Sequence, residues 1–294
     1  MKPLILALPA NENLAARIAL GIQGEVGQAE FRRFPDDESY VRLISEVEGR
    51  SVVLAATLDR PDSKFVQLAL TSAIVRENGA KRVGLAAPYL PYMRQDRSFK
   101  PGEAMSARIF AHYLSGMADW LVTVDPHLHR IERLSEVYNM PTQVVHASSS
   151  IARWIAKEVE RPLLIGPDEE SLQWTKLVAD EVKAPFVVSR KHRTDDRHVE
   201  ISIPDLRQWK DRTPVLVDDV ISTGRTMIET INRLQEAGMK RPWCVATHAV
   251  FAGQAYHHLR LAGPAGIATT NTITHETNAI DISAPISEQI LNLI

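Results

Sequence analysis

The chain has 294 residues, enough for two domains of ordinary size. Apolar residues make up 45% of it and charged residues 24%, values that are typical of a globular protein. A formal net charge of −2 at pH 7 argues against a general affinity for nucleic acid or for an anionic membrane. No signal peptide opens the chain, no apolar run could span a membrane, and a single cysteine excludes an intrachain disulfide, so we expect a cytoplasmic protein.

Short apolar runs alternate with helical patterns along the whole chain. The predicted strands are residues 4–8, 51–56, 82–87, 121–124, 163–165, 186–188, 215–217, 243–247 and 267–270. The predicted helices include residues 13–20, 65–78, 106–117, 148–160, 171–182 and 226–237. This alternation predicts an α/β fold of mostly parallel sheets flanked by helices, with ligands at the carboxyl ends of the strands.

Two segments suggest that the halves of the chain are related. Residues 121–125 read LVTVD and residues 215–218 read VLVD, in both cases a predicted strand that ends in an aspartate. Together with the chain length, this pattern predicts two stacked domains, residues 1–141 and residues 142–294.

Polar segments interrupt the predicted elements of the first half. Residues 34–38 (FPDDE) form an acidic loop before an alternating strand. Residues 88–103 (PYLPYMRQDRSFKPGE) leave a strand and lead into the helix that begins at Ser106. Their arginines could grip phosphates in bidentate contacts, although a charged run of this kind also suits a solvated loop. Residues 125–127 (DPH) follow a strand directly, where such sheets bind ligands.

The second half contains the most informative stretch, residues 214–226 (PVLVDDVISTGRT). It reads as a buried strand, two adjacent carboxylates, a turn of small hydroxyl residues, and the start of a helix. Thr226 and Glu229 have the spacing of a capping box, which predicts a helix start at Thr226. Backbone amides at a helix N-terminus bind phosphate, and adjacent carboxylates accept hydrogen bonds from a diol. The stretch therefore predicts a sugar-phosphate site.

Residues 214–226 closely resemble the phosphoribosyl pyrophosphate (PRPP) signature of the type I phosphoribosyltransferase fold. That fold houses phosphoribosyltransferases and ribose-phosphate pyrophosphokinases, which are also called PRPP synthetases. Residues 88–103 are similar to a segment of the synthetases that plain phosphoribosyltransferases do not carry. Residues 246–253 (ATHAVFAG) and 270–273 (TNTI) resemble further segments of the synthetases, and the resemblance runs from about residue 4 to the C-terminus.

The resemblance implies two stacked phosphoribosyltransferase-like domains and a role for each motif. Lys191 and Arg193 would stabilise the transition state, while His127 and Asp168 would organise Mg²⁺. The residues implied to bind ATP are Phe34, Asp36, Glu38, Arg94, Gln95, Asp96, Arg97 and His127. Those implied to bind ribose 5-phosphate are Asp218, Asp219, Ser222, Thr223, Gly224, Arg225 and Thr226.

Some positions depart from the family pattern. Asp37 stands where the family usually has glycine, and residues 169–171 (EES) bring acidic groups close to the implied pyrophosphate loop. Because the family's adenine loop reaches into a neighbouring subunit, the resemblance also implies a homo-oligomer, either a dimer or a hexamer.

These observations predict a ribose-phosphate pyrophosphokinase, which transfers the diphosphoryl group of ATP to the C1 hydroxyl of ribose 5-phosphate and forms PRPP and AMP. One alternative is a phosphoribosyltransferase that consumes PRPP, against which the RQDR segment at residues 94–97 argues. The other is a non-catalytic regulatory protein associated with PRPP synthetase, which the acidic departure at residues 169–171 motivates.

Overall fold

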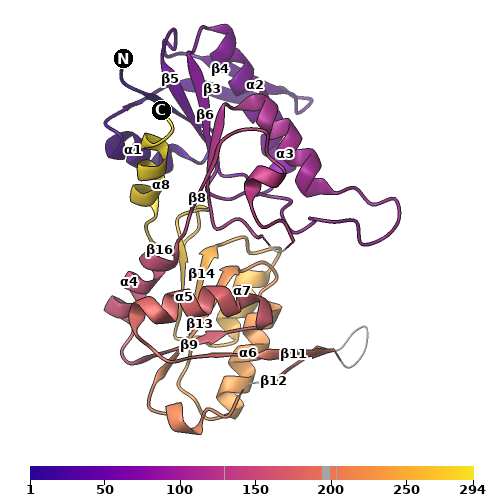
Figure 1. Ribbon diagram of the computed structural model, residues 1–294, viewed down its shortest axis with the longest axis vertical. Helices are drawn as coiled ribbons and strands as arrows, with labels where there is room; N and C mark the ends of the chain where they lie inside the picture. The colour runs from indigo at the N-terminus through magenta and orange to yellow at the C-terminus, as the bar shows by residue number, and fades with distance from the viewer. Residues whose placement is uncertain (129, 194–198, 203) are drawn as a thin grey trace. The chain divides into compact units, whose positions relative to one another are not determined.

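The computed structural model describes residues 1–128, 130–193, 199–202 and 204–294 (Figure 1). The chain divides into two compact units. Unit 1 comprises Met1–Val145 together with Ile282–Ile294, and unit 2 comprises His146–Asp281. Within the described residues, no helix has both the length and the apolar character that crossing a membrane requires.

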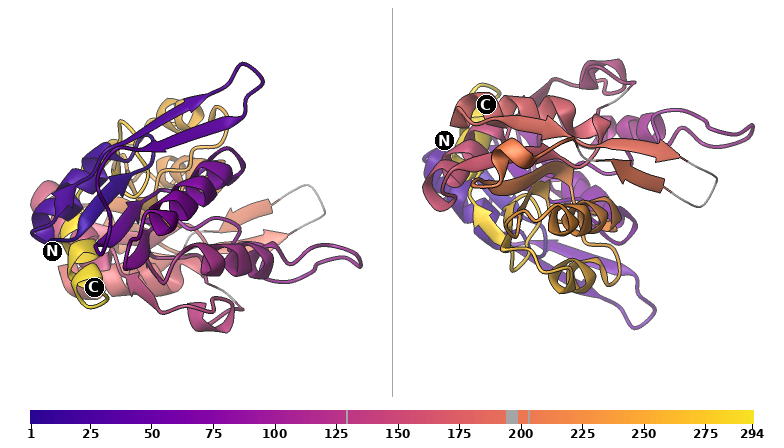
Figure 2. Two further views of the ribbon diagram at one scale, coloured as in Figure 1. Left: turned by 90° about the horizontal axis from the view of Figure 1, so that it is seen from above. Right: turned by 90° about the horizontal axis from the view of Figure 1, so that it is seen from below.

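Unit 1 is built on a parallel sheet whose described strands lie in the order β2-β1-β5-β6-β7-β8. Its strands are β1 (Leu4–Ala7), β2 (Glu25–Val26), β5 (Ser51–Ala55), β6 (Arg82–Ala86), β7 (Trp120–Val124) and β8 (Thr142–Val145). Its helices are α1 (Glu12–Gly21), α2 (Pro61–Glu77), α3 (Ser106–Met117), a 3₁₀ turn at Leu134–Glu136, and α8 (Ser283–Leu291). A separate antiparallel hairpin, β3 (Ala29–Arg33) and β4 (Ser39–Leu43), projects from this unit (Figure 2).

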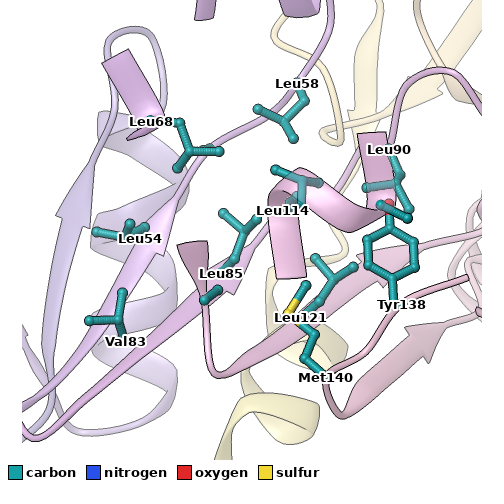
Figure 3. Packing of buried hydrophobic residues seen from close by; sticks show 14 of the residues in the cluster. Leu54, Leu58, Leu68, Val83, Leu85, Leu90, Leu114, Leu121, Tyr138 and Met140 are labelled. Carbon is teal, nitrogen blue, oxygen red and sulfur yellow. The ribbon is translucent and has the colours of Figure 1, made fainter. Parts of the chain in front are cut away.

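The core of unit 1 follows from the register of its strands. Leu54, Leu85 and Leu121 lie on one row across β5, β6 and β7, and all three side chains are fully buried. Leu114 of α3 belongs to the same apolar cluster (Figure 3). Burial of each such side chain stabilises the fold by about 1.5–3 kcal/mol relative to exposure. Strands buried on both faces carry nearly continuous apolar runs, which explains why these segments were readable in the sequence.

Unit 2 repeats the architecture, with described strands in the order β10-β9-β13-β14-β15-β16, again parallel. The strands are β9 (Pro162–Gly166), β10 (Phe186–Val188), β13 (Thr213–Val220), β14 (Trp243–His248), β15 (Gly266–Thr270) and β16 (Asn278–Ile280). The helices are α4 (Ser148–Glu158), α5 (Leu172–Val182), α6 (Arg225–Glu236) and α7 (Ala255–Leu261), with 3₁₀ turns at Glu169–Ser171 and Arg207–Trp209. A separate hairpin pairs β11 (Arg190–Arg193) with β12 (Val199–Ser202).

The two units share one topology. In each, the second strand of the chain lies at the sheet edge, a separate hairpin follows it, and the next strand returns beside the first. By this order β5 corresponds to β13, and the β3–β4 hairpin corresponds to the β11–β12 hairpin. The predicted α/β fold of mostly parallel sheets flanked by helices is confirmed. The similarity between residues 121–125 and residues 215–218 does not join equivalent strands. Residues 121–124 form β7, whose counterpart in unit 2 is β15 and not β13.

Other local expectations also differ from the structure. The division expected after residue 141 would separate β8 and α8 from unit 1, yet β8 pairs with β7 and α8 packs against α1. Helix α6 begins at Arg225 with Gly224 as its N-cap, so Thr226 lies inside the first turn and is not the cap.

Candidate active site

The turn between β13 and α6 presents backbone groups at a helix N-terminus. Gly224 adopts a left-handed conformation with φ of 70°, which glycine populates without the steric cost that a Cβ atom would bring. As the N-cap it has no side chain to accept a hydrogen bond from the first-turn amides. Ser222 is half-buried beside the turn, and Thr223 and Arg225 are exposed at it. The arrangement can accept an anion.

Three carboxylates gather near the carboxyl ends of the adjacent strands β9 and β13. Asp218 and Asp219 are the last acidic residues of β13, and Asp168 follows β9. The backbone N–H of Asp219 donates to Asp218 Oδ1 at 3.0 Å. Burial raises the pKa of the Asp218 carboxyl well above its ordinary value of 3.8, and the negative charges of Asp219 and Asp168 raise it further. Cations or hydroxyl donors placed here would relieve this repulsion.

The loop after β9 explains how the acidic departure from the family pattern is accommodated. Ser171 is buried, and its Oγ donates to Asp168 O at 2.5 Å while its backbone N–H donates to Asp168 Oδ1 at 3.3 Å. Gly166 leaves room for this serine, because a Cβ atom there would lie 2.6 Å from Ser171 Oγ. The side chains of Glu169 and Glu170 are exposed. Their charge is therefore turned toward solvent, while Ser171 shapes the Asp168 loop.

The FPDDE segment forms the loop of the β3–β4 hairpin. Phe34 N–H donates to Glu38 O at 2.8 Å, and Asp37 N–H donates to Phe34 O at 2.9 Å. Asp37 has a φ of 68°, so it takes the left-handed conformation that glycine would favour and that aspartate tolerates better than most residues. The Phe34 ring is 39% exposed and meets Tyr40 edge-on at 6.0 Å. The loop thus presents an aromatic ring beside carboxylates.

The guanidinium group of Arg32 lies over this aromatic pair, 4.6 Å from the Phe34 centroid and 3.9 Å from that of Tyr40. Cation–π contacts of this kind stabilise an arrangement by roughly 0.5–1 kcal/mol at exposed positions. They hold the base of the hairpin loop, so the Phe34 ring keeps a defined orientation although it is partly exposed.

The segments that follow β6 and β7 meet because these strands are neighbours in the sheet. Asp96 is buried and accepts hydrogen bonds from Arg130, from the backbone N–H at 3.1 Å and from Nη1 at 3.0 Å. Burial would raise the pKa of Asp96, but the Arg130 donors outweigh it and hold the pKa below its ordinary value. Gln95 Oε1 accepts from Ser106 Oγ at 2.6 Å, which fixes the segment against α3.

The outer part of this segment is basic and aromatic. Arg94 and Arg97 are exposed, and the Phe99 ring lies 4.9 Å from the Arg97 guanidinium and 5.8 Å from that of Arg130. His127 is half-buried in the loop that follows β7. The predicted nucleotide residues thus differ in their contacts. Asp96 positions Arg130, whereas Arg94 and Arg97 are exposed.

The predicted catalytic pair lies on the β11–β12 hairpin. The backbone of Lys191 pairs with that of Ile201, and Arg193 pairs with Val199. Their side chains, and residues 194–198, lie outside what the structure describes. Among the described residues no group of three or more His, Cys, Asp or Glu side chains is arranged to hold a metal ion on its own.

Comparison with known proteins decides the family. The family described as the N-terminal domain of ribose phosphate pyrophosphokinase matches residues 3–117, and the family described as the phosphoribosyl transferase domain matches residues 136–283. Ribose-phosphate pyrophosphokinase of Methanopyrus kandleri is 34% identical, with 99% of each chain covered. The chain belongs to the ribose-phosphate pyrophosphokinase family. The predicted membership of this enzyme family is thereby confirmed.

Two further relatives agree. The ribose-phosphate pyrophosphokinase of Saccharolobus solfataricus is 34% identical over 88% of this chain and 90% of its own. The crystal structure of phosphoribosylpyrophosphate synthetase from Mycobacterium smegmatis superposes with a TM-score of 0.84 at 25% identity, covering 100% of this chain and 99% of that one. Family membership therefore extends over both units.

The structure adds one residue and one role that sequence reasoning did not identify. Arg130 engages Asp96, and Ser171, named in the sequence only as part of the departure at residues 169–171, orders the Asp168 loop. The first could have been suspected from its place next to the DPH segment, in a loop that follows a sheet strand. The role of Ser171 carried no sequence signal, since it depends on the space that Gly166 leaves above the sheet.

Proposed function

We propose that the chain transfers the diphosphoryl group of ATP to the C1 hydroxyl of ribose 5-phosphate, forming PRPP and AMP. The observation that carries the proposal is the junction of β13 and α6, where an acidic pair directly precedes a glycine-capped helix N-terminus. One end of that junction suits sugar hydroxyls and the other suits a phosphate monoester. Family membership supplies the reaction class.

The turn would hold the 5-phosphate of the sugar. Backbone amides at the start of α6 and the hydroxyls of Ser222, Thr223 and Thr226 are donors of the required kind. Arg225 is exposed in the first helical turn, where the helix dipole disfavours a cation unless an anion is bound nearby. Its position therefore supports an anionic ligand at this end of α6.

The acidic pair would hold the ribose hydroxyls. Asp219 is buried, so a hydrogen bond that it accepts from a hydroxyl is screened less by solvent than one at the surface. Asp218 already accepts the amide of Asp219, which orients its carboxylate in the turn. The two side chains can accept hydrogen bonds from neighbouring hydroxyls of one sugar.

The carboxylates also fit Mg²⁺. Burial is the main cause of the raised pKa of Asp218, and repulsion from Asp219 and Asp168 raises it further; a divalent cation favours such an anionic oxygen environment. Mg²⁺ commonly uses one or two carboxylates and completes its shell with water and substrate phosphates, so a complete protein cage is not required. Asp168 would hold the ion on the sugar side and His127 on the nucleotide side. When bound, the ion would neutralise phosphate charge.

Unit 1 would supply the nucleotide contacts. Arg94 and Arg97 are exposed and carry the planar guanidinium that suits phosphate oxygens, while Phe34 offers a ring for the adenine. Gln95 and Asp96 support these groups through Ser106 and Arg130. Asp36 and Glu38 of the same hairpin loop are acceptors for the adenine amino group.

In the reaction, the C1 hydroxyl oxygen forms a bond to the β-phosphorus of ATP. The bond from that phosphorus to the oxygen bridging it to the α-phosphorus breaks, AMP leaves with this oxygen, and the hydroxyl proton passes to solvent. Lys191 and Arg193 would stabilise the charge that develops on the transferred group. A homo-oligomer in which the adenine loop is shared, and a cytoplasmic location, stay predictions.

A product assay tests the proposal. Purified protein supplied with Mg²⁺, ATP and ribose 5-phosphate should form AMP and PRPP in equal amounts, and omission of the sugar or of Mg²⁺ should abolish both. ADP as the nucleotide product would reject diphosphoryl transfer. Consumption of PRPP with a free base would indicate a phosphoribosyltransferase, and a folded but inactive protein would indicate the regulatory alternative.

A further inference from the structure

The segment that follows β14, residues 249–253, is hydrogen-bonded to the turn that precedes α6. Phe251 N–H donates to Ile221 O at 2.9 Å, and Ala252 N–H donates to Ser222 O at 3.0 Å. Just before this segment, His248 O accepts from Ile221 N–H at 3.1 Å. The start of the β13–α6 turn is therefore held through main-chain bonds by one neighbouring segment. Substitutions other than proline keep these main-chain donors, but they can move the segment that carries them.

Phe251 is held in place by two aromatic neighbours. Its ring centroid lies 4.5 Å from that of His275 and 5.3 Å from that of Tyr256, and the last two lie 4.8 Å apart. Phe251 is 7% exposed and has a φ of 38°, a left-handed conformation that a bulky side chain rarely adopts. Such a conformation persists only where surrounding contacts fix it, and it often occurs beside functional sites.

The two partners of Phe251 are themselves anchored. His275 N–H donates to Asn278 Oδ1 at 2.9 Å, and its Nδ1 lies 2.9 Å from Thr277 Oγ1. Tyr256 stands in the first turn of α7, whose N-terminal residue Ala255 donates its N–H to Ala252 O at 3.1 Å. The aromatic trio, Phe251, Tyr256 and His275, thus joins residues 249–253 to α7 and to the start of β16.

Helix α7 also approaches the turn directly. A Cβ atom at Gly224 would lie 3.8 Å from Ala255 O and 4.0 Å from Leu259 Cβ. Figure 1 shows α7 in the same part of unit 2 as β14 and α6. The backbone of the turn is consequently fixed at Ile221 and Ser222 by the loop and flanked at Gly224 by the helix, and the aromatic trio connects the two supports.

We propose that the aromatic trio positions the phosphate-binding turn, so that Phe251, Tyr256 and His275 are positioning residues for ribose 5-phosphate. The inference rests on the proposed function, in which this turn binds the 5-phosphate. The trio touches the turn through the main chain of residues 251 and 252, and it acts by holding Ile221 and Ser222 where a rigid set of phosphate donors requires them. A displaced turn would bind the sugar phosphate less tightly while the nucleotide contacts of unit 1 stay intact.

Ring packing is separable from hydroxyl chemistry at Tyr256, which gives a matched pair of variants. Tyr256→Leu removes the ring, whereas Tyr256→Phe keeps it and removes only the hydroxyl. We expect Tyr256→Leu to raise KM for ribose 5-phosphate about tenfold, since small misplacements of binding groups have large effects. KM for ATP should stay within about twofold of the parent, and Tyr256→Phe should restore the parent value. Tyr113→Leu, the same substitution on α3, should leave KM for ribose 5-phosphate unchanged.

His275 provides a second, independent pair. His275→Ala removes a ring from the trio and His275→Phe retains one, so the first should raise KM for ribose 5-phosphate and the second should not. Titration calorimetry with ribose 5-phosphate measures the same contrast as a change in Kd, without any turnover. These variants keep the test decisive if Tyr256→Leu does not fold, and thermal melts identify the folded variants.

Two results would overturn the proposal. In the first, the folded ring-deleting variants bind ribose 5-phosphate like the parent. In the second, the variants show general damage to unit 2. This would be seen if KM for ATP rises as much as KM for ribose 5-phosphate, or if the ring-retaining variants raise KM for ribose 5-phosphate as much as the ring-deleting ones. Asp219→Asn separates this failure from failure of the proposed function. If Asp219→Asn weakens sugar binding and the trio variants do not, only the positioning role is lost. If the parent itself does not bind ribose 5-phosphate, the proposed function fails first.

Discussion

The β5–α2 junction of unit 1 and the β13–α6 junction of unit 2 occupy the same place in the shared topology, but they carry different side chains. In both, a strand leads to a residue in the left-handed conformation that caps a helix: Arg60 with φ of 50° and Gly224 with φ of 70°. In unit 1 a lysine side chain of the same unit occupies the turn. Lys64 Nζ donates to Thr57 O at 2.9 Å and is paired with Asp59.

The sequence differences at the two junctions are few. Unit 1 has Pro61 at the first helical position, which removes a backbone N–H from the helix N-terminus, and its strand ends in alanines where β13 carries the acidic pair. Neither helix has a side-chain cap hydrogen bond, but in unit 2 the hydroxyl residues Ser222 and Thr223 lie beside the helix N-terminus. The comparison teaches that the fold supplies a turn and a helix N-terminus twice, and that a handful of residues distinguishes the junction we propose as a sugar-phosphate site from its counterpart.

The hairpins inserted at the same point of each unit can be compared in the same way. The β3–β4 hairpin presents Phe34 in its loop, whereas the β11–β12 hairpin carries Lys191 and Arg193. If the second hairpin serves chemistry and the first serves nucleotide binding, substitutions should affect different kinetic constants. This contrast gives the largest effect that we predict.

Lys191→Ala should lower kcat by roughly 100- to 1,000-fold, because a donor aimed at developing charge contributes about 3–4 kcal/mol to the transition state. KM should change little, and Arg193→Ala should behave similarly, with a double variant that loses less than the sum. Phe34→Ala should instead raise KM for ATP. Lys176→Ala, an exposed lysine on α5, is the control and should retain parental rates. Parental kcat in folded Lys191→Ala would remove the catalytic role of this hairpin.

Asp219→Asn addresses the contrast between the two junctions themselves. Replacement of a charged acceptor by a neutral one weakens a hydrogen bond to a sugar hydroxyl, and we expect kcat/KM for ribose 5-phosphate to fall by roughly 10- to 100-fold. KM for ATP should be nearly unchanged. The matched variant Asp59→Asn at the filled junction should affect melting temperature but not sugar kinetics. Equal effects of both variants would show that the two junctions do not differ in function.

The sequence predicted the strands well where burial on both faces produced continuous apolar runs, as at residues 51–56 and 121–124. It did not reveal the short elements β8, β16 and α7. It also did not reveal α8, which belongs to unit 1 although it is distant in the chain from the rest of that unit. The packing of α8 against α1 is a long-range contact with no local pattern. The position of the division between domains was therefore not readable near the C-terminus.

The candidate site was predicted in the same uneven way. The DDVISTGRT segment combines strand, acidic pair and turn within consecutive residues, so a linear motif contained the whole arrangement. Arg130 and Asp96 are separated by 34 residues, and the pair forms because β6 and β7 are neighbours in the sheet. The link between Phe251 and the turn depends in the same way on neighbouring strands, β13 and β14. Interactions of this kind follow from topology and cannot be read from spacing.

Gly224→Ala tests whether the left-handed residue matters equally at the two junctions. Space is available for a Cβ atom at Gly224, so the cost arises from φ and should be about 1–2 kcal/mol of unfolding free energy. We expect KM for ribose 5-phosphate to rise by roughly five- to tenfold as the turn relaxes. Arg60→Gly at the other junction should leave sugar kinetics at the parental level. Gly116→Ala, on a helix with open space, is the control and should not destabilise the protein.

The smallest predicted effect, a shift in melting temperature with pH, contrasts Asp218 of unit 2 with Asp96 of unit 1. The pKa of Asp218 is raised, first by burial and then by Asp219 and Asp168, so its stabilising contribution is complete below pH 3.8 and is lost as pH rises through the folded-state pKa. The pKa of Asp96 is lowered because Arg130 outweighs the effect of burial. Its contribution is present above pH 3.8 and is lost as pH falls through the folded-state value.

Neutral substitutions should therefore have opposite signs. Without Mg²⁺, Asp218→Asn should raise the melting temperature at pH 7–8 by about 2–4 °C, the shift expected for roughly 1 kcal/mol in a domain of this size, and the gain should vanish toward pH 4. Asp96→Asn should lower the melting temperature at pH 7, and its deficit should shrink toward pH 3. Thermal melts of both variants and the parent across this range measure the signs. Shifts of the same sign at pH 7 would contradict the opposite electrostatics of the two carboxylates, since one faces like charges and the other faces a guanidinium.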